Sequence, residues 1–154
     1  MGAAVLRDAQ FHWFLGVTRR VVSPCMLEIL LHTLKEALLQ AWSYQLSSVE
    51  LDLGQEILDK LHAGPLGCRS YLWEVVGEII ELLERQGTIS VNYAQRSVNL
   101  VAAVLAFSQR AQSDMVVLHG ETPRSLQLAL ELDVQTFHLA QQLQAEVDAQ
   151  ALAS

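Results

Sequence analysis

The chain has 154 residues, of which 51% are hydrophobic and 18% are charged, and its formal net charge is −7. This length fits one domain with a sizeable core, and the apolar content excludes an intrinsically disordered chain. The basic residues do not cluster, and the apolar runs are shorter than the ~18 residues of a membrane span. We therefore expect neither a nucleic-acid partner nor a membrane span.

The N-terminal part of the chain predicts two helices. Apolar residues recur at helical spacing from about Ala3 to Val21, which indicates a first helix. Ser23-Pro24 combines an N-cap residue with a proline suited to the first helical position, so a second helix is expected to run to about Tyr44. Ile29 and Leu39 fall on the polar side of that second helix. We interpret these two residues as candidates for a partner-binding surface.

Two shorter helices are predicted in the middle of the chain. Ser47-Ser48 can cap a third helix, although the residues from Val49 to Leu53 alternate as a strand would. That helix is expected to stop at the Gly- and Pro-containing turn from His62 to Gly67. A fourth helix is predicted from about Cys68 to Gly87, a residue that favours a helix C-terminus.

The segment from Val91 to Arg110 is apolar around most of its circumference when it is drawn as a helix. A helix of this kind has to be enclosed by other helices. It is followed by four consecutive apolar residues, Met115, Val116, Val117 and Leu118. We interpret this run either as a short helix or strand packed on the core, or as an exposed anchor for a partner.

A last helix is predicted to begin at Thr122-Pro123. Its expected solvent-facing residues are polar: Gln127, Glu131, Gln135, His138 and Gln142. From Gln144 onward the composition becomes Ala, Gln and acid, and residues 144–154 are expected to form a frayed tail.

Taken together, these patterns predict an all-α fold. We expect a single domain over residues 1–154, built as a bundle of about six helices around a buried central helix at residues 91–110. A segment of a helical-repeat protein is an alternative form of the same prediction, since paired helices of this length make up such repeats.

No catalytic or cofactor motif is present, and we expect no cofactor and no metal. Cys25 and Cys68 each fall at the start of a predicted helix, where the helix N-terminus favours a thiolate. Cysteine-dependent activity at Cys68 is therefore the alternative to a non-catalytic protein. Two cysteines without disulfide or metal-ligand spacing favour an intracellular location, either cytoplasmic or nuclear.

These observations favour a non-catalytic interaction module, a scaffold or adaptor subunit that binds another protein through exposed apolar helix surface. The expected surface comprises Ile29, Leu39, Met115, Val116, Val117 and Leu118. Self-association into a homo-oligomeric structural protein is one alternative. In a second alternative, the stretch from Trp73 to Glu78 is similar to the short helical motif of apoptosis regulators, which implies a helical groove, but the Asn-Trp-Gly-Arg signature of that family is missing.

Overall fold

The computed structural model describes residues 1–8, 12–46, 48–85, 88–93 and 100–153. These residues form a mixed α/β fold with helices and two small sheets, so the prediction of an all-α six-helix bundle was wrong. In chain order the elements are β1 (Gly2–Arg7), β2 (Trp13–Arg19), α1 (Met26–Ser43), β3 (Ser48–Leu53), α2 (Gln55–Ala63), α3 (Trp73–Arg85), β4 (Thr88–Tyr93), α4 (Leu100–Ser108), β5 (Val116–His119) and α5 (Gln127–Ala153).

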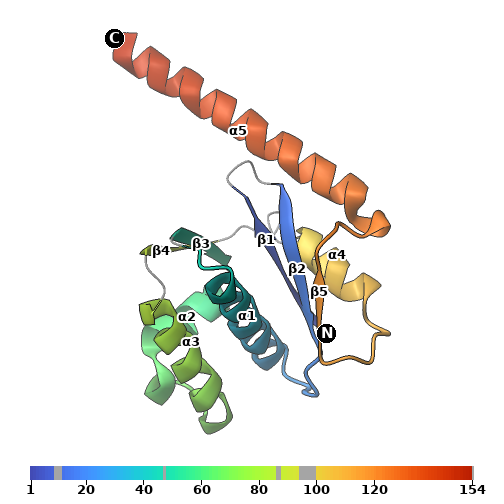
Figure 1. Cartoon of the computed structure of the whole chain (residues 1–154). Helices are drawn as coiled ribbons and strands as arrows, with labels where there is room; N and C mark the ends of the chain where they lie inside the picture. The colour runs from blue at the N-terminus through green and yellow to red at the C-terminus, as the bar shows by residue number, and fades with distance from the viewer. Residues whose placement is uncertain (9–11, 47, 86–87, 94–99, 154) are drawn as a thin grey trace.

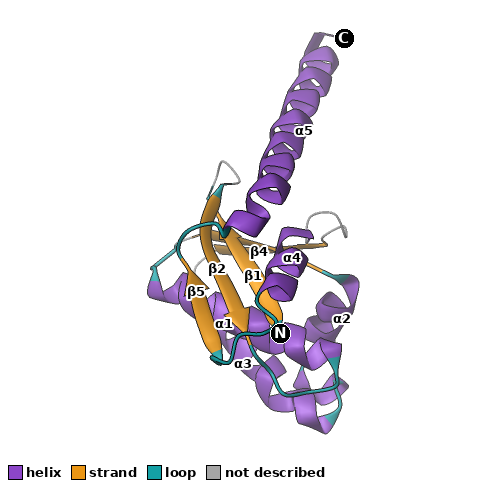
Figure 2. Ribbon diagram, turned by 90° about the vertical axis from the view of Figure 1, so that its right-hand side faces the viewer, coloured by secondary structure: helices purple, strands orange, loops and turns teal. Residues whose placement is uncertain are grey.

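The first sheet is antiparallel and has the strand order β1-β2-β5. One face contacts α1: a Cβ atom added at Gly2 would meet the side chains of Ile29 and Thr33. The other face contacts α4, since a Cβ atom at Gly16 would lie 3.2 Å from Leu105. The sheet thus lies between two helices (Figure 2).

Residues predicted as one helix from Ala3 to Val21 form the hairpin of β1 and β2 instead. At its turn the backbone N–H of His12 donates to Asp8 Oδ1 at 2.9 Å. Gly16 disfavours a helix interior, and the β-branched residues that follow it, Val17 and Thr18, suit a strand. Both β-branched side chains are fully buried, so packing between two helices decides the conformation of this segment.

The helical half of the fold surrounds the main hydrophobic core, which α1, α2 and α3 share. Its fully buried or nearly buried members include Leu31, Leu38, Leu72, Val76 and Ile79. The helices α1 and α3 confirm the second and fourth predicted helices, with ends a few residues inside the expected ones. Burial of several large side chains at helical spacing explains why these two segments were predictable.

The second sheet pairs β3 and β4 in parallel, with Leu51 opposite Val91. Parallel strands need a long crossover, which α2 and α3 provide here. The alternating residues of β3 were predicted to be helical, and this was wrong.

The enclosed central helix predicted at residues 91–110 is absent from the part of this segment that the structure describes. Its beginning belongs to strand β4, residues 94–99 lie outside the described residues, and only Leu100–Ser108 is helical. Helix α4 is buried on one side through Val101 and Leu105, while Phe107 is exposed. It covers one sheet face and is not a core surrounded by helices.

The last element, α5, extends well beyond the rest of the molecule (Figure 1). Residues 144–153, expected to fray, continue this helix to Ala153. Over the stretches that the structure describes, no helix is both long enough and apolar enough to cross a membrane.

Candidate interaction surface

Helix α5 is favoured by its own composition. Its 27 residues are rich in Ala, Leu, Gln and Glu and contain neither glycine nor proline. At ~1.5 Å per residue it is about 40 Å long. None of its residues is buried, although helices in folded proteins are stabilised mainly by packing of an apolar face.

The N-terminal half of α5 is fixed to the body of the molecule. Arg7 at the end of β1 donates to Asp133 Oδ2 at 2.9 Å, and both side chains are largely buried. Near this ion pair the His138 ring contacts the His12 ring edge-on, with centroids 6.1 Å apart. Leu130, Val134 and Phe137 on the same side of the helix are half-buried.

The opposite side of α5 carries a row of exposed apolar residues. Leu128, Leu132, Leu139, Leu143 and Val147 follow one another at intervals of four, seven, four and four residues. This spacing puts them on one face of a helix. Their exposed fractions range from 54% to 69%. We call these five residues the leucine face.

Four of the five residues that the sequence predicted to face solvent on this helix are exposed: Gln127, Glu131, Gln135 and Gln142. The expected solvent-facing side included His138, yet His138 is half-buried and its Nε2 atom is enclosed by protein without a hydrogen-bond partner. The leucine face was not among the residues that the sequence predicted to bind a partner. Its spacing was visible in the sequence, but the hairpin that occupies the other side of α5 was not predicted.

The residues proposed from sequence as a partner surface are not brought together as one patch. Ile29 is only 8% exposed and packs toward β1, so it is not available to a partner. Leu39 is exposed on the outer side of α1, near the exposed Trp42 three residues later.

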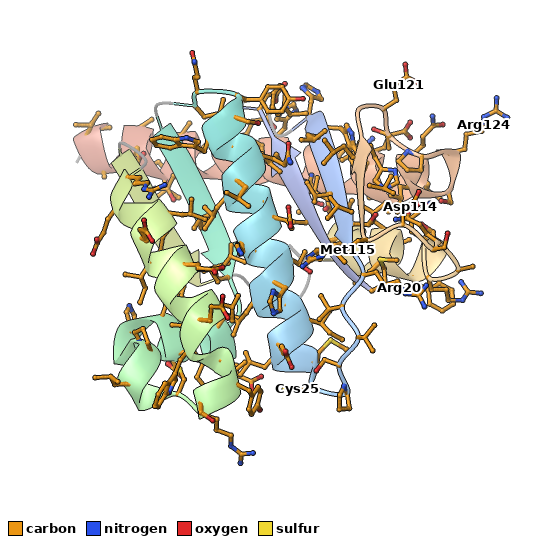
Figure 3. The ribbon with its side chains drawn as sticks, turned by 60° about the horizontal axis from the view of Figure 1, so that its bottom comes forward. Arg20, Cys25, Asp114, Met115, Glu121 and Arg124 are labelled. Atoms are coloured by element: carbon orange, nitrogen blue, oxygen red, sulfur yellow. The ribbon has the colours of Figure 1, made fainter. Side chains whose placement is uncertain are left out.

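The Met115–Leu118 segment lies at the edge of the first sheet. Val116, Val117 and Leu118 belong to β5, which pairs with β2 and is an outer strand. Met115 precedes the strand, and its carbonyl accepts a hydrogen bond from the backbone N–H of Arg20 at 2.7 Å. Met115 and Leu118 are both exposed. Figure 3 shows Met115 beside Arg20.

A polar groove of about 250 Å³ lies between α1 and α3. It is lined by Glu28, His32, Lys35, Tyr71, Glu74, Val75 and Glu78. Lys35 forms an ion pair with Glu78 across the groove. Burial, with a smaller contribution from the charge of Arg19, lowers the pKa of His32 below its ordinary value.

Cys25 is the N-cap residue of α1 and lies at the start of that helix (Figure 3). Its pKa is lowered, first by the backbone N–H of Glu28 and then by the hydroxyl of Tyr71, which lies 3.8 Å from the sulfur. His32 is seven residues further along α1, which at ~1.5 Å per residue separates the two by about 10 Å. The described groups therefore do not form a Cys–His pair.

Cys68 lies outside the first turn of α3, contrary to the sequence expectation. Its thiol donates to the backbone carbonyl of Gly64 at 3.4 Å. This geometry ties the thiol to the preceding turn.

A second hollow, of about 420 Å³, is open to solvent beside the N-terminus of α1 and is lined by Met1, Arg20, Val21, Val22, Ser23, Pro24 and Arg110. Each guanidinium donates to a backbone carbonyl, Arg20 to Gln112 and Arg110 to Phe107, both at 2.8 Å. Within the described ranges no group of three or more His, Cys, Asp or Glu residues could hold a metal ion.

Comparison with protein-family models, with curated proteins and with solved structures gave no match.

Proposed function

We propose that this chain is a non-catalytic protein-interaction module that binds a partner along α5. The observation that carries the proposal is the leucine face, a row of exposed apolar side chains on a helix whose other side is packed against the body along its N-terminal half. Solvated helix faces are normally polar, and a contiguous exposed apolar surface is typical of an interaction site. The binding mode would be helix packing against helix.

The exposure of the leucine face determines how much binding free energy a partner can gain by covering it. Covering a half-exposed leucine contributes on the order of 1 kcal/mol, so five such residues supply several kcal/mol before the costs of association are subtracted. A partner helix would also stabilise the distal half of α5, which makes few contacts with the body (Figure 1). Binding and helix stability would therefore increase together.

Two further apolar positions belong to the same proposal as secondary surfaces. The outer edge of β5, with Met115 and Leu118, could receive an added strand. Leu39 and Trp42 form an exposed pair on α1. Both surfaces are much shorter than the leucine face, so we expect them to extend an interface and not to create one.

The proposed setting is intracellular, cytoplasmic or nuclear, because Cys25 and Cys68 are both free thiols. The net charge of −7 supports a protein partner over a nucleic acid.

The test compares the native chain with two variants. Each tagged form is purified from the cells that produce it, and the proteins bound to it are quantified by mass spectrometry. The variant Leu139→Asp/Leu143→Asp charges the leucine face. The variant Gln141→Asp/Ala145→Asp adds the same charge to the same helix, on sides that point away from that face. We expect the leucine variant to lose specific partners at least tenfold, while the control retains them.

Equal retention by both variants would refute α5 as the interface. Light scattering of the purified chain at low micromolar concentration examines the alternative of a homo-oligomer. A monomer supports a separate partner, whereas a dimer that the leucine variant separates shows self-association through α5.

A further inference from the structure

Resting on the proposed function of α5, we infer that its partner is a helix that carries lysine or arginine residues beside an apolar stripe, and not a second copy of this chain. The charges of α5 that lie beside the leucine face determine which partner helix fits it.

All charged residues of α5 are acidic: Glu131, Asp133, Glu146 and Asp148. Asp133 is engaged with Arg7 on the body side. Glu131 and Glu146 are exposed, and among the described residues neither has a cation within ion-pair distance. An α-helix turns by about 100° per residue, and this rotation places Glu131 and Glu146 along the same edge of the leucine face.

The two acidic side chains are fifteen residues apart, which corresponds to about 22 Å along the helix axis. The opposite edge carries Ala129, Thr136 and Ala140, and its acidic residue, Asp133, is already paired with Arg7. An amphipathic helix with basic residues along one flank would place its cations against Glu131 and Glu146 while its apolar stripe covers the leucines. Charges that flank an apolar seam in this way determine partner choice in coiled coils.

A second copy fits this face poorly. In an antiparallel pair of identical helices the same edge meets the same edge, so Glu131 of one copy would lie near Glu146 of the other. In a parallel pair the edge of Glu131 and Glu146 would meet the opposite edge of the other copy, which carries no cation. Like charges that flank a helix interface are destabilising. The acidic edge therefore opposes an antiparallel pair of copies, finds no cation in a parallel pair, and favours a basic partner.

The experiment uses the full chain and designed three-heptad peptides as probes. One peptide has leucine at the a and d positions and lysine at e and g, and its twin has glutamate at e and g. A third peptide keeps the lysines but replaces the leucines by serine. Calorimetric titration measures binding to the native chain, to Leu139→Asp/Leu143→Asp and to Glu131→Gln/Glu146→Gln, and light scattering gives the oligomeric state.

We expect the leucine–lysine peptide to bind at least tenfold more tightly than either other peptide. Both variants of the chain should bind this peptide less tightly than the native chain does. Binding to the glutamine variant should also depend less on the salt concentration. Binding of the glutamate twin with equal or higher affinity would overturn the inference, as would equal binding of the leucine–lysine peptide to the leucine variant.

A dimer that the leucine variant separates would also overturn the basic-partner inference while leaving α5 as an interface. No binding of any peptide by a monomeric chain would reject both the inference and the proposed function.

Discussion

Arg7 and Asp133, separated by 126 positions in the sequence, form a largely buried ion pair at 2.9 Å that joins the first strand to the last helix. The pair determines which side of α5 is covered. With Asp133 held against β1, the leucine face points away from the body. The orientation of this candidate interface therefore depends on this ion pair, on the ring contacts beside it and on the half-buried apolar residues of the same side of α5.

Replacing Asp133 by Asn should loosen α5 without unfolding the core. Loss of a charge-assisted hydrogen bond costs about 1–2 kcal/mol, so opening of the helix should become roughly five- to thirtyfold more frequent. Hydrogen exchange of the amides from Gln127 to Phe137 measures this opening. Glu131→Gln, on the same helix but exposed, should leave exchange almost unchanged, and equal acceleration in both variants would show that the ion pair does not hold the helix.

Leu31 and Leu30 provide a matched test of the core between α1, α2 and α3. Leu31 is fully buried, whereas its neighbour is 36% exposed. Leu31→Ala should lower the free energy of unfolding by roughly 2–5 kcal/mol through lost contacts and a cavity. Leu30→Ala should cost less than about 1 kcal/mol. Urea denaturation decides the point, and similar losses at both positions would contradict the assigned orientation of α1.

Gly16 is required where β2 approaches α4. A Cβ atom at this position would overlap the ring of Trp13 and press on Leu105. Gly16→Ala should therefore destabilise the protein by about 1–3 kcal/mol and change the fluorescence of Trp13. Gly120→Ala is the control, because nothing lies within 4 Å of its added Cβ atom. A neutral Gly16→Ala variant would mean that α4 does not pack on this face.

Two half-buried histidines predict acid sensitivity. Burial lowers the pKa of His119, and burial is also the largest cause at His32, from an ordinary value of 6.5. The unfolded chain then binds protons more readily than the folded one. The stability that the folded protein gains from keeping these two histidines neutral is therefore complete above pH 6.5 and is lost as the pH falls below it. The urea midpoint of the native chain should be lower at about pH 5.5 than at about pH 7.5. In the variant His32→Gln/His119→Gln this difference between the two midpoints should be smaller. If the variant shows the same difference in urea midpoint as the native chain, the two histidines are not the cause of the acid sensitivity.

Sequence patterns predicted the helices whose periodicity was reinforced by end signals. Ser23-Pro24 located the start of α1 to within two residues, although the N-cap residue is Cys25, and the apolar spacing located α3 and α5. The strands were missed because each is short and its residues also fit a helical stripe. In β2, for example, Trp13 and Val17 are four residues apart, as on one side of a helix, and only pairing with β1 and β5 makes the segment a strand.

The candidate site was only partly predictable for the same physical reason. Exposure at Leu39, Met115 and Leu118 agrees with the sequence expectation, but Ile29 is covered by β1, which was itself unpredicted. The leucine face could be read from its spacing. Its exposure could not, because that depends on the long-range contact between Arg7 and Asp133.

The most direct test of the proposed interface is an NMR titration of the chain with labelled leucine and valine methyl groups, using the leucine–lysine peptide as probe. We predict shift changes at the methyls of Leu132, Leu139, Leu143 and Val147. The methyls of Leu66, which is more exposed than these and distant in sequence, should be unaffected. Changes confined to Leu39 or Leu118, with the α5 methyls unmoved, would contradict the assignment of α5 as the interface.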